Sequence, residues 1–147
     1  MYKSIVVGTD GSVSARGALQ AAIDLARSFD GRLHVVCVHD PGPSSAALVS
    51  SPGAAVAVAE IESAAVEHVE HVLAEAQAAA EAAGVDATVH APVGAPGSAL
   101  VQVAASEGAD LVVVGNRGMR GVRRVLGSVP NHVTHHASCA VLLVPTA

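Results

Sequence analysis

The stretch VVVGNRGMRGVRRVLGSVP, residues 112–130, places four glycines and four arginines behind a run of valines. Glycine lets the main chain approach an oxyanion with no side chain in the way, and arginine supplies positive charge. The stretch closes at Gly127 and Ser128, where a helix is predicted to begin and to present N–H groups that lack helical partners. These features favour a phosphate-binding loop, and a solubilising surface loop is the plainer alternative.

A second glycine-rich turn, GTDGS at residues 8–12, follows the first apolar run of the chain. The carboxylate of Asp10 suits a sugar, because carboxylates accept hydrogen bonds from ribose hydroxyls and repel phosphate unless a cation intervenes. The same side chain could instead cap the helix that follows. Asp10 is therefore a candidate ribose ligand with a structural alternative.

Two pairs of histidines have a spacing that can bind metal. His132 and His136 are four residues apart and His68 and His71 are three apart, so each pair would share one helix face. Neither pair has an evident third ligand in the sequence. Exposed helix faces are therefore the expectation, and no metal site formed by the protein is predicted.

The composition restricts the class of protein. A chain of 147 residues fits one domain, taken as residues 1–147, and its hydrophobic 51% comes mainly from Ala and Val. One Tyr, one Phe and no Trp leave little for RNA bases to stack on, and a net charge of −5 disfavours nucleic acid and anionic membranes. With no apolar run long enough for a membrane span and no signal-peptide pattern, the expected location is the cytoplasm. Cys37 and Cys139 lack CxxC spacing and are expected to be reduced thiols.

Five short apolar runs alternate with longer helical patterns. The runs are continuous and rich in β-branched residues, as in parallel strands covered on both faces, and they occupy residues 4–10, 33–40, 86–94, 110–116 and 139–145. Ser12 or Ser14 is expected to cap the first helix, with Gly31 past its end, and Gly84 and Gly108 end the next two. This alternation predicts a single α/β domain with a doubly wound, Rossmann-like parallel sheet of five strands and helices on both faces.

The longest predicted helix carries an apolar seam at three- and four-residue spacing, formed by Val58, Ile61, Ala65, Val69, Val72, Ala76 and Ala80. The residues before it, 41–55, are rich in Pro, Gly, Ser and Ala. This composition predicts a mobile excursion from the domain rather than a linker between domains.

The two glycine-rich stretches occupy the expected ligand position. In doubly wound sheets ligands bind beyond the carboxyl ends of the strands, where the strand order reverses, and both stretches follow strands. The Walker A pattern GxxxxGK[ST] is missing, and the first turn lacks GxGxxG. A P-loop NTPase and classical NAD binding are therefore disfavoured.

The run IVVGTDGS (5–12), the GAP turn (94–96), the distal GSV and the closing VLLVP together resemble the universal stress protein family over residues 3–145. The resemblance implies a strand order of 3-2-1-4-5 and a homodimer paired through the last strand. It also implies ATP binding by a G-x2-G-x9-G-[ST] pattern. Here Gly115, Gly118, Gly127 and Ser128 match that pattern, except that eight residues rather than nine separate Gly118 from Gly127.

The resemblance also assigns roles by position. Thr9 and Asp10 would face adenine and ribose, and Val38 would border adenine unless it simply belongs to the core. The ribose and phosphates would contact Gly115, Gly118, Gly127, Ser128 and Val129, although Ser128 also suits the N-cap of the last helix. The implied ligand is ATP or another adenine nucleotide such as cyclic AMP, and any Mg²⁺ would bind mainly through the phosphates.

Three functions are compatible with these residues. The leading prediction is an adenine-nucleotide-binding regulator of stress response or signalling that acts on an unknown protein partner. The second is a weak ATP hydrolase, for which the spacing indicates no catalytic residue. The third is a dimeric interaction module that has lost nucleotide binding through its shortened loop.

Overall fold

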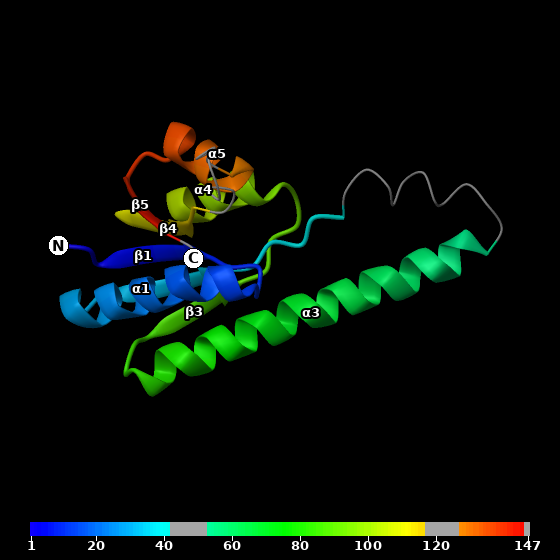
Figure 1. Cartoon of the computed structure of the whole chain (residues 1–147), viewed down its shortest axis with the longest axis horizontal. Helices are drawn as coiled ribbons and strands as arrows, with labels where there is room; N and C mark the ends of the chain where they lie inside the picture. The colour runs from blue at the N-terminus through cyan, green and yellow to red at the C-terminus, as the bar shows by residue number, and fades with distance from the viewer. Residues whose placement is uncertain (42–52, 117–126, 146–147) are drawn as a thin grey trace.

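A computed structural model describes residues 1–41, 53–116 and 127–145. Its centre is one parallel sheet with the order β3-β2-β1-β4-β5, which confirms the predicted order. The strands are β1 (Ser4–Gly8), β2 (Arg32–Val36), β3 (Ala87–His90), β4 (Leu111–Gly115) and β5 (Ala140–Val144). Figure 1 shows the sheet with β5 near one edge and β3 near the other.

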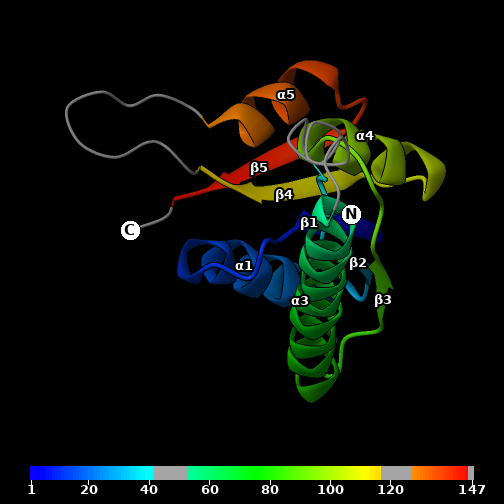
Figure 2. The same ribbon diagram turned by 90° about the vertical axis from the view of Figure 1, so that its right-hand side faces the viewer.

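The continuous apolar runs form strands because both faces of the sheet are covered. Ile5, Val6 and Val7 in β1 are all fully buried, which an alternating strand with one wet face would not allow. Helices α1 (Val13–Phe29) and α3 (Ala54–Ala82) pack on one face, and α4 (Pro96–Ser106) and α5 (Ser128–His136) pack on the other (Figure 2). The doubly wound arrangement is therefore confirmed.

Helix α1 begins and ends through local hydrogen bonds. Ser12 is the N-cap, and its hydroxyl accepts a hydrogen bond from the N–H of Ala15 at 3.2 Å. At the other end, Asp30 rather than Gly31 adopts the left-handed conformation, with φ 51°. Gly31 is needed for a different reason, because a Cβ there would lie 2.6 Å from the main-chain oxygen of Tyr2.

Helix α3 is much longer than the strands on which it packs. Its 29 residues span about 44 Å at 1.5 Å per residue, whereas a five-residue strand spans about 16 Å. The carboxyl half of the predicted seam is buried, at Val69, Val72, Ala76 and Ala80. The amino half projects past the sheet, as Figure 1 shows, and Ile61 in that half of the seam is 62% exposed.

The predicted excursion at residues 41–55 lies mostly outside the described residues. Its last two residues belong to α3, which begins at Ala54 after Gly53. None of the helices in the described ranges is long and apolar enough to cross a membrane.

Cys37 and Cys139 are both free. Cys37 follows β2 and Cys139 precedes β5, and strands β1 and β4 lie between them in the sheet. Burial raises the pKa of both thiols, and the charges of Asp10 and Asp110 add to the effect at Cys37 and Cys139 respectively. Both side chains are therefore protonated and weakly reactive at neutral pH.

Candidate functional site

A pocket lies at the carboxyl ends of β1 and β4. From β1 the chain crosses to β2 on one side, whereas β4 and β5 lie on the other, so this is the position where the strand order reverses. The lining residues come from both glycine-rich regions, the first turn of α1, the end of β2 with the residues after it, and α4: Gly8, Thr9, Asp10, Ser12, Ser14, Ala15, Val36, Val38, Pro96, Leu100, Val114, Gly115, Val129 and Pro130. The structure thus brings together residues that are more than 100 positions apart in the sequence.

The turn between β1 and α1 is held by its own side chains. The N–H of Gly11 donates to the hydroxyl of Thr9 at 3.2 Å, and the N–H of Ser12 donates to the carboxylate of Asp10 at 2.9 Å. Because Ser12 caps α1, the alternative role of Asp10 as that cap was wrong. Asp10 instead closes a local turn at the pocket wall.

Gly11 adopts φ 80°, a left-handed conformation that side chains disfavour. A Cβ at this position would also lie 2.5 Å from Cγ2 of Val72 on α3. Glycine therefore allows the turn its shape and lets α3 pack directly against it.

The opposite wall is formed where β4 ends and α5 begins. Gly115 is the last residue of β4, and Gly127 is the N-cap of α5, so the prediction of Ser128 as the cap was wrong. A glycine cap has no side chain to bond the first N–H groups of the helix. Pro130 has no N–H, and the N–H of Asn131 bonds the oxygen of Gly127 at 3.0 Å. The helix start therefore presents the N–H groups of Ser128 and Val129.

The floor of the pocket is apolar. Val36, Leu100 and Val114 are buried in the core cluster between the sheet and α4 and α5. Val38 is half-buried, packs against the same cluster and lines the pocket as well, so its two predicted roles are not exclusive. Such a surface suits the flat face of an aromatic base.

Most of the predicted site residues meet here. Thr9, Asp10, Val38, Gly115 and Val129 line the pocket. Gly127 and Ser128 do not line it, but they begin α5 directly before Val129. Gly118 and the four arginines of the stretch lie outside the described residues.

The predicted histidine pairs lie on helices. The rings of His132 and His136 are stacked, with centroids 4.1 Å apart, on α5. Nε2 of His71 lies 3.3 Å from Oε1 of Glu75, which is one turn further along α3, and both side chains are exposed.

Sequence reasoning missed a cluster of His34, His90 and Glu107, which come from β2, β3 and the end of α4. The signal was weak, because these residues are widely separated and no local spacing joins them. Only the pairing of β2 with β3 and the packing of α4 bring the three side chains together.

The parallel sheet, its helical layers and a pocket at the strand reversal define a doubly wound α/β protein. A family model described as "Universal stress protein family" matches residues 1–145. The chain belongs to this family.

Relatives cover nearly the whole chain. Universal stress protein Rv1636 of Mycobacterium tuberculosis is 37% identical over 150 residues, covering 99% of this chain and 97% of that protein. Universal stress protein MJ0531 of Methanocaldococcus jannaschii is 32% identical over 145 residues, covering 98% of this chain and 82% of that protein.

Solved structures share the fold. A universal stress protein crystallised in complex with cAMP is 34% identical, with a TM-score of 0.76 and coverage of 99% of both chains. UspA of Lactobacillus plantarum has a TM-score of 0.81 at 23% identity, over 97% of each chain, and supports the fold alone.

Proposed function

We propose that this chain binds an adenine nucleotide in the pocket between β1 and β4 and acts as a nucleotide-dependent regulator of stress response or signalling. The observation that carries the proposal is the chemistry of the pocket. An apolar floor and one carboxylate line the pocket, and α5 begins beside it at Ser128 and Val129, whose N–H groups lack helical partners. These three surfaces match a base, a ribose and a phosphate.

The base and ribose would bind along β1 and β2. Val38 would border adenine, and Thr9 and Asp10 would face adenine and ribose. One oxygen of Asp10 is oriented by the N–H of Ser12 at 2.9 Å, which fixes the carboxylate at the wall of the pocket. A carboxylate held in this way can accept a hydrogen bond from a ribose hydroxyl without further ordering.

The phosphates would bind at the start of α5. The N–H groups of Ser128 and Val129 and the hydroxyl of Ser128 lie at the positive end of the helix dipole. Gly115 and Gly127, at the flanks of the glycine stretch, leave the main chain open to approach. Gly118 has the same role in the proposal.

The ligand is ATP or a related adenine nucleotide such as cyclic AMP. Support comes from the relative solved with cAMP, which is 34% identical along nearly its whole length. Where Mg²⁺ takes part, it would bind mainly through nucleotide phosphates, because Asp10 is the only carboxylate among the described lining residues.

The proposal includes a homodimer paired through β5, a protein partner that reads the bound state and a cytoplasmic location. The edge position of β5 supports the dimer, because an unpaired edge strand exposes main-chain groups that readily pair with another chain.

The proposal is tested by purifying the protein under native conditions, denaturing it and identifying the released small molecules by mass spectrometry. We expect an adenine nucleotide to co-purify. A turnover assay with ATP then separates a regulator, which leaves ATP intact, from a hydrolase. A protein that carries no nucleotide and binds none when it is added would be an interaction module instead.

A further inference from the structure

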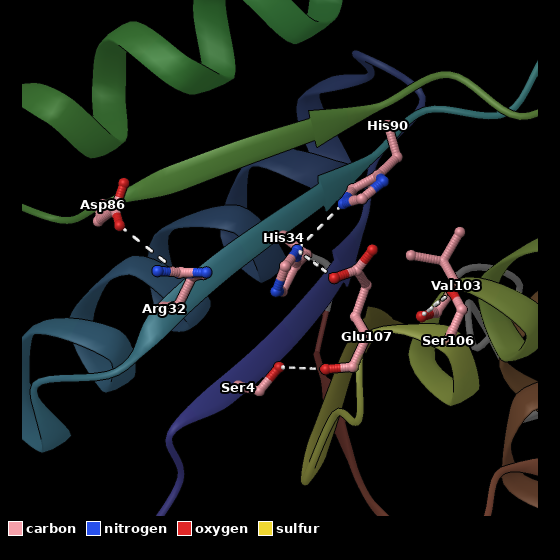
Figure 3. A network of polar contacts seen from close by, with 8 residues as sticks. All are labelled: Ser4, Arg32, His34, Asp86, His90, Val103, Ser106 and Glu107. Atoms are coloured by element: carbon pink, nitrogen blue, oxygen red, sulfur yellow. Dashed lines mark hydrogen bonds and ion pairs between the residues drawn. The ribbon is translucent and has the colours of Figure 1, made fainter.

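Three side chains outside the nucleotide pocket converge on one point. Nδ1 of His34 lies 3.0 Å from Nε2 of His90 and 4.0 Å from Oε2 of Glu107. One ligand atom from each residue lies within 4.8 Å of the other two. Figure 3 shows the two rings and the carboxylate pointing toward one another from β2, β3 and the end of α4.

The cluster has its own access to solvent. His34 and Glu107 line a groove of about 430 Å³, together with residues at the amino ends of β1 and β2 such as Ser4 and Arg32. None of the three clustered residues lines the nucleotide pocket. The groove and the nucleotide pocket are therefore separate, and the groove gives a hydrated ion a path to His34 and Glu107.

The framework around the cluster is fixed. His34 is 4% exposed within the sheet, and His90 ends the neighbouring strand β3. Glu107 is the C-cap of α4, where its N–H donates to the oxygen of Val103 at 2.9 Å and its own oxygen accepts from the hydroxyl of Ser4 at 3.3 Å. Its side chain is 38% exposed, so the carboxylate can adjust while the backbone stays in place.

The separations fit a small divalent ion. Zinc binds nitrogen and oxygen at about 2.0–2.2 Å in a tetrahedron, which puts neighbouring ligand atoms roughly 3.3–3.5 Å apart. The two nitrogens, 3.0 Å apart, are slightly closer than this, and Oε2 of Glu107, 4.0 Å from Nδ1 of His34, is slightly farther. The partly exposed carboxylate can move toward the rings to complete the set. Two histidines and one glutamate form a known three-residue zinc set that leaves the fourth position to water.

We propose that His34, His90 and Glu107 bind one Zn²⁺ ion between β2, β3 and the end of α4. In the metal-free protein one of the two facing ring nitrogens donates a hydrogen bond to the other. On metal binding the donating ring would move that proton to its other nitrogen, so that His34 carries its proton on Nε2 and His90 carries its proton on Nδ1. The site rests on this geometry and does not depend on the nucleotide proposal.

The electrostatic surroundings agree with this assignment. Burial lowers the pKa of His34, against the opposing charge of Glu107, so the neutral ring that a metal requires is present at neutral pH. The groove is lined by two cations, Lys3 and Arg32, and by three carboxylates, those of Asp30, Asp86 and Glu107. Arg32 is paired with Asp86 at 3.5 Å. The carboxylates outnumber the cations by one, so the groove does not repel a divalent cation.

The test titrates the full, metal-free chain with Zn²⁺ by calorimetry in the absence of nucleotide. His90→Gln and Glu107→Gln each remove one ligand. The matched controls are His71→Gln and Glu75→Gln, which change the same residue types in the exposed pair on α3. We expect one tight site per wild-type chain, with Kd at least ~10–100-fold weaker in either ligand variant. The two control variants should bind as the wild type does.

Cobalt provides the second readout, because Co²⁺ in a four-coordinate site absorbs visible light strongly and aqueous Co²⁺ does not. The bands should appear in the wild type and in both controls, and disappear in the ligand variants. If His90→Gln fails to fold, Glu107→Gln decides alone, since its side chain is partly exposed. The proposal would be overturned if a folded Glu107→Gln protein kept the wild-type affinity for Zn²⁺ and the cobalt bands. It would also be overturned if the α3 controls lost as much affinity as the ligand variants, or if the wild type had no tight Zn²⁺ site.

Discussion

Asp10 is oriented by its own turn rather than by the helix that follows it. One of its oxygens accepts from the N–H of Ser12, while the hydroxyl of Ser12 caps α1. The sequence alone selected this carboxylate as a candidate ribose ligand, and that role stays a prediction. It did not distinguish a cap from a turn, because both roles use an aspartate at the same place and differ only in which N–H is bonded.

Asp10→Asn should weaken ATP binding while the fold stays intact. The amide oxygen can still accept from Ser12, but the charge that strengthens the ribose hydrogen bond is lost. The expected loss is roughly 10- to 100-fold, as for a hydrogen bond to a charged group. With an ATP analogue that lacks both ribose hydroxyls, the wild type and the variant should bind equally. If Asp10→Asn weakened binding of that analogue as much as it weakened binding of ATP, Asp10 would not be a ribose ligand.

Gly11→Ala should destabilise the protein more than Gly84→Ala does. Both glycines adopt left-handed φ, 80° and 74°, so both substitutions carry a backbone strain of about 1–2 kcal/mol. Only at Gly11 would the new Cβ meet a neighbour, Val72 at 2.5 Å, whereas nothing lies within 4 Å at Gly84. The clash should add about 1–3 kcal/mol to the loss in free energy of unfolding, measured by urea denaturation. Equal losses would mean that α3 is not packed on the turn.

At the scale of elements, the apolar runs predicted the five strands with ends that differ by a few residues, and the family resemblance supplied their order. The strand prediction succeeded because each strand is a continuous apolar run between turn residues. The sequence did not separate the buried half of α3 from the exposed half, because Ile61 continues the apolar seam and the sequence does not reveal that the sheet ends before the helix does. It also missed the cluster of His34, His90 and Glu107, which depends on pairing and packing between elements.

Leu73→Ala and Ile61→Ala should therefore differ although both lie on α3. Leu73 is 5% exposed in the core between α3 and the sheet, so its truncation should cost about 2–5 kcal/mol. Ile61 is 62% exposed, and alanine is a better helix former, so Ile61→Ala should change stability by less than about 0.5 kcal/mol. Thermal and urea unfolding measure both. A large loss at Ile61 would indicate that another surface covers this part of the helix.

At the scale of the whole molecule, the ladder between β4 and β5 determines which main-chain groups of β5 would face a partner in the proposed dimer. The N–H of Asn116 donates to the oxygen of Val144, so the main-chain groups of Val144 face β4. Those of Leu142, two residues earlier, face β4 as well, and those of Val141 and Leu143 face the open edge. A proline at Leu142 would thus break the ladder within the chain rather than the dimer.

Leu142→Asp is the better test of the dimer. The side chain is 37% exposed near the middle of β5, and two like charges facing each other across a two-fold axis would repel. Light scattering should show a dimeric wild type and a monomeric variant. Val66→Asp on α3, where Val66 is 46% exposed, should remain dimeric. A wild type that is monomeric at micromolar concentration would contradict pairing through β5.

Nucleotide binding in the pocket between β1 and β4 is the central claim, and calorimetry of the wild-type chain with ATP and with cyclic AMP, in the presence of Mg²⁺, tests it most directly. The account predicts binding of at least one of the two with a dissociation constant in the micromolar range. Ligand at 100 times that constant should stabilise the fold by about 2.7 kcal/mol and raise Tm by several degrees. No heat of binding and no shift in Tm with either nucleotide at millimolar concentration would contradict the account.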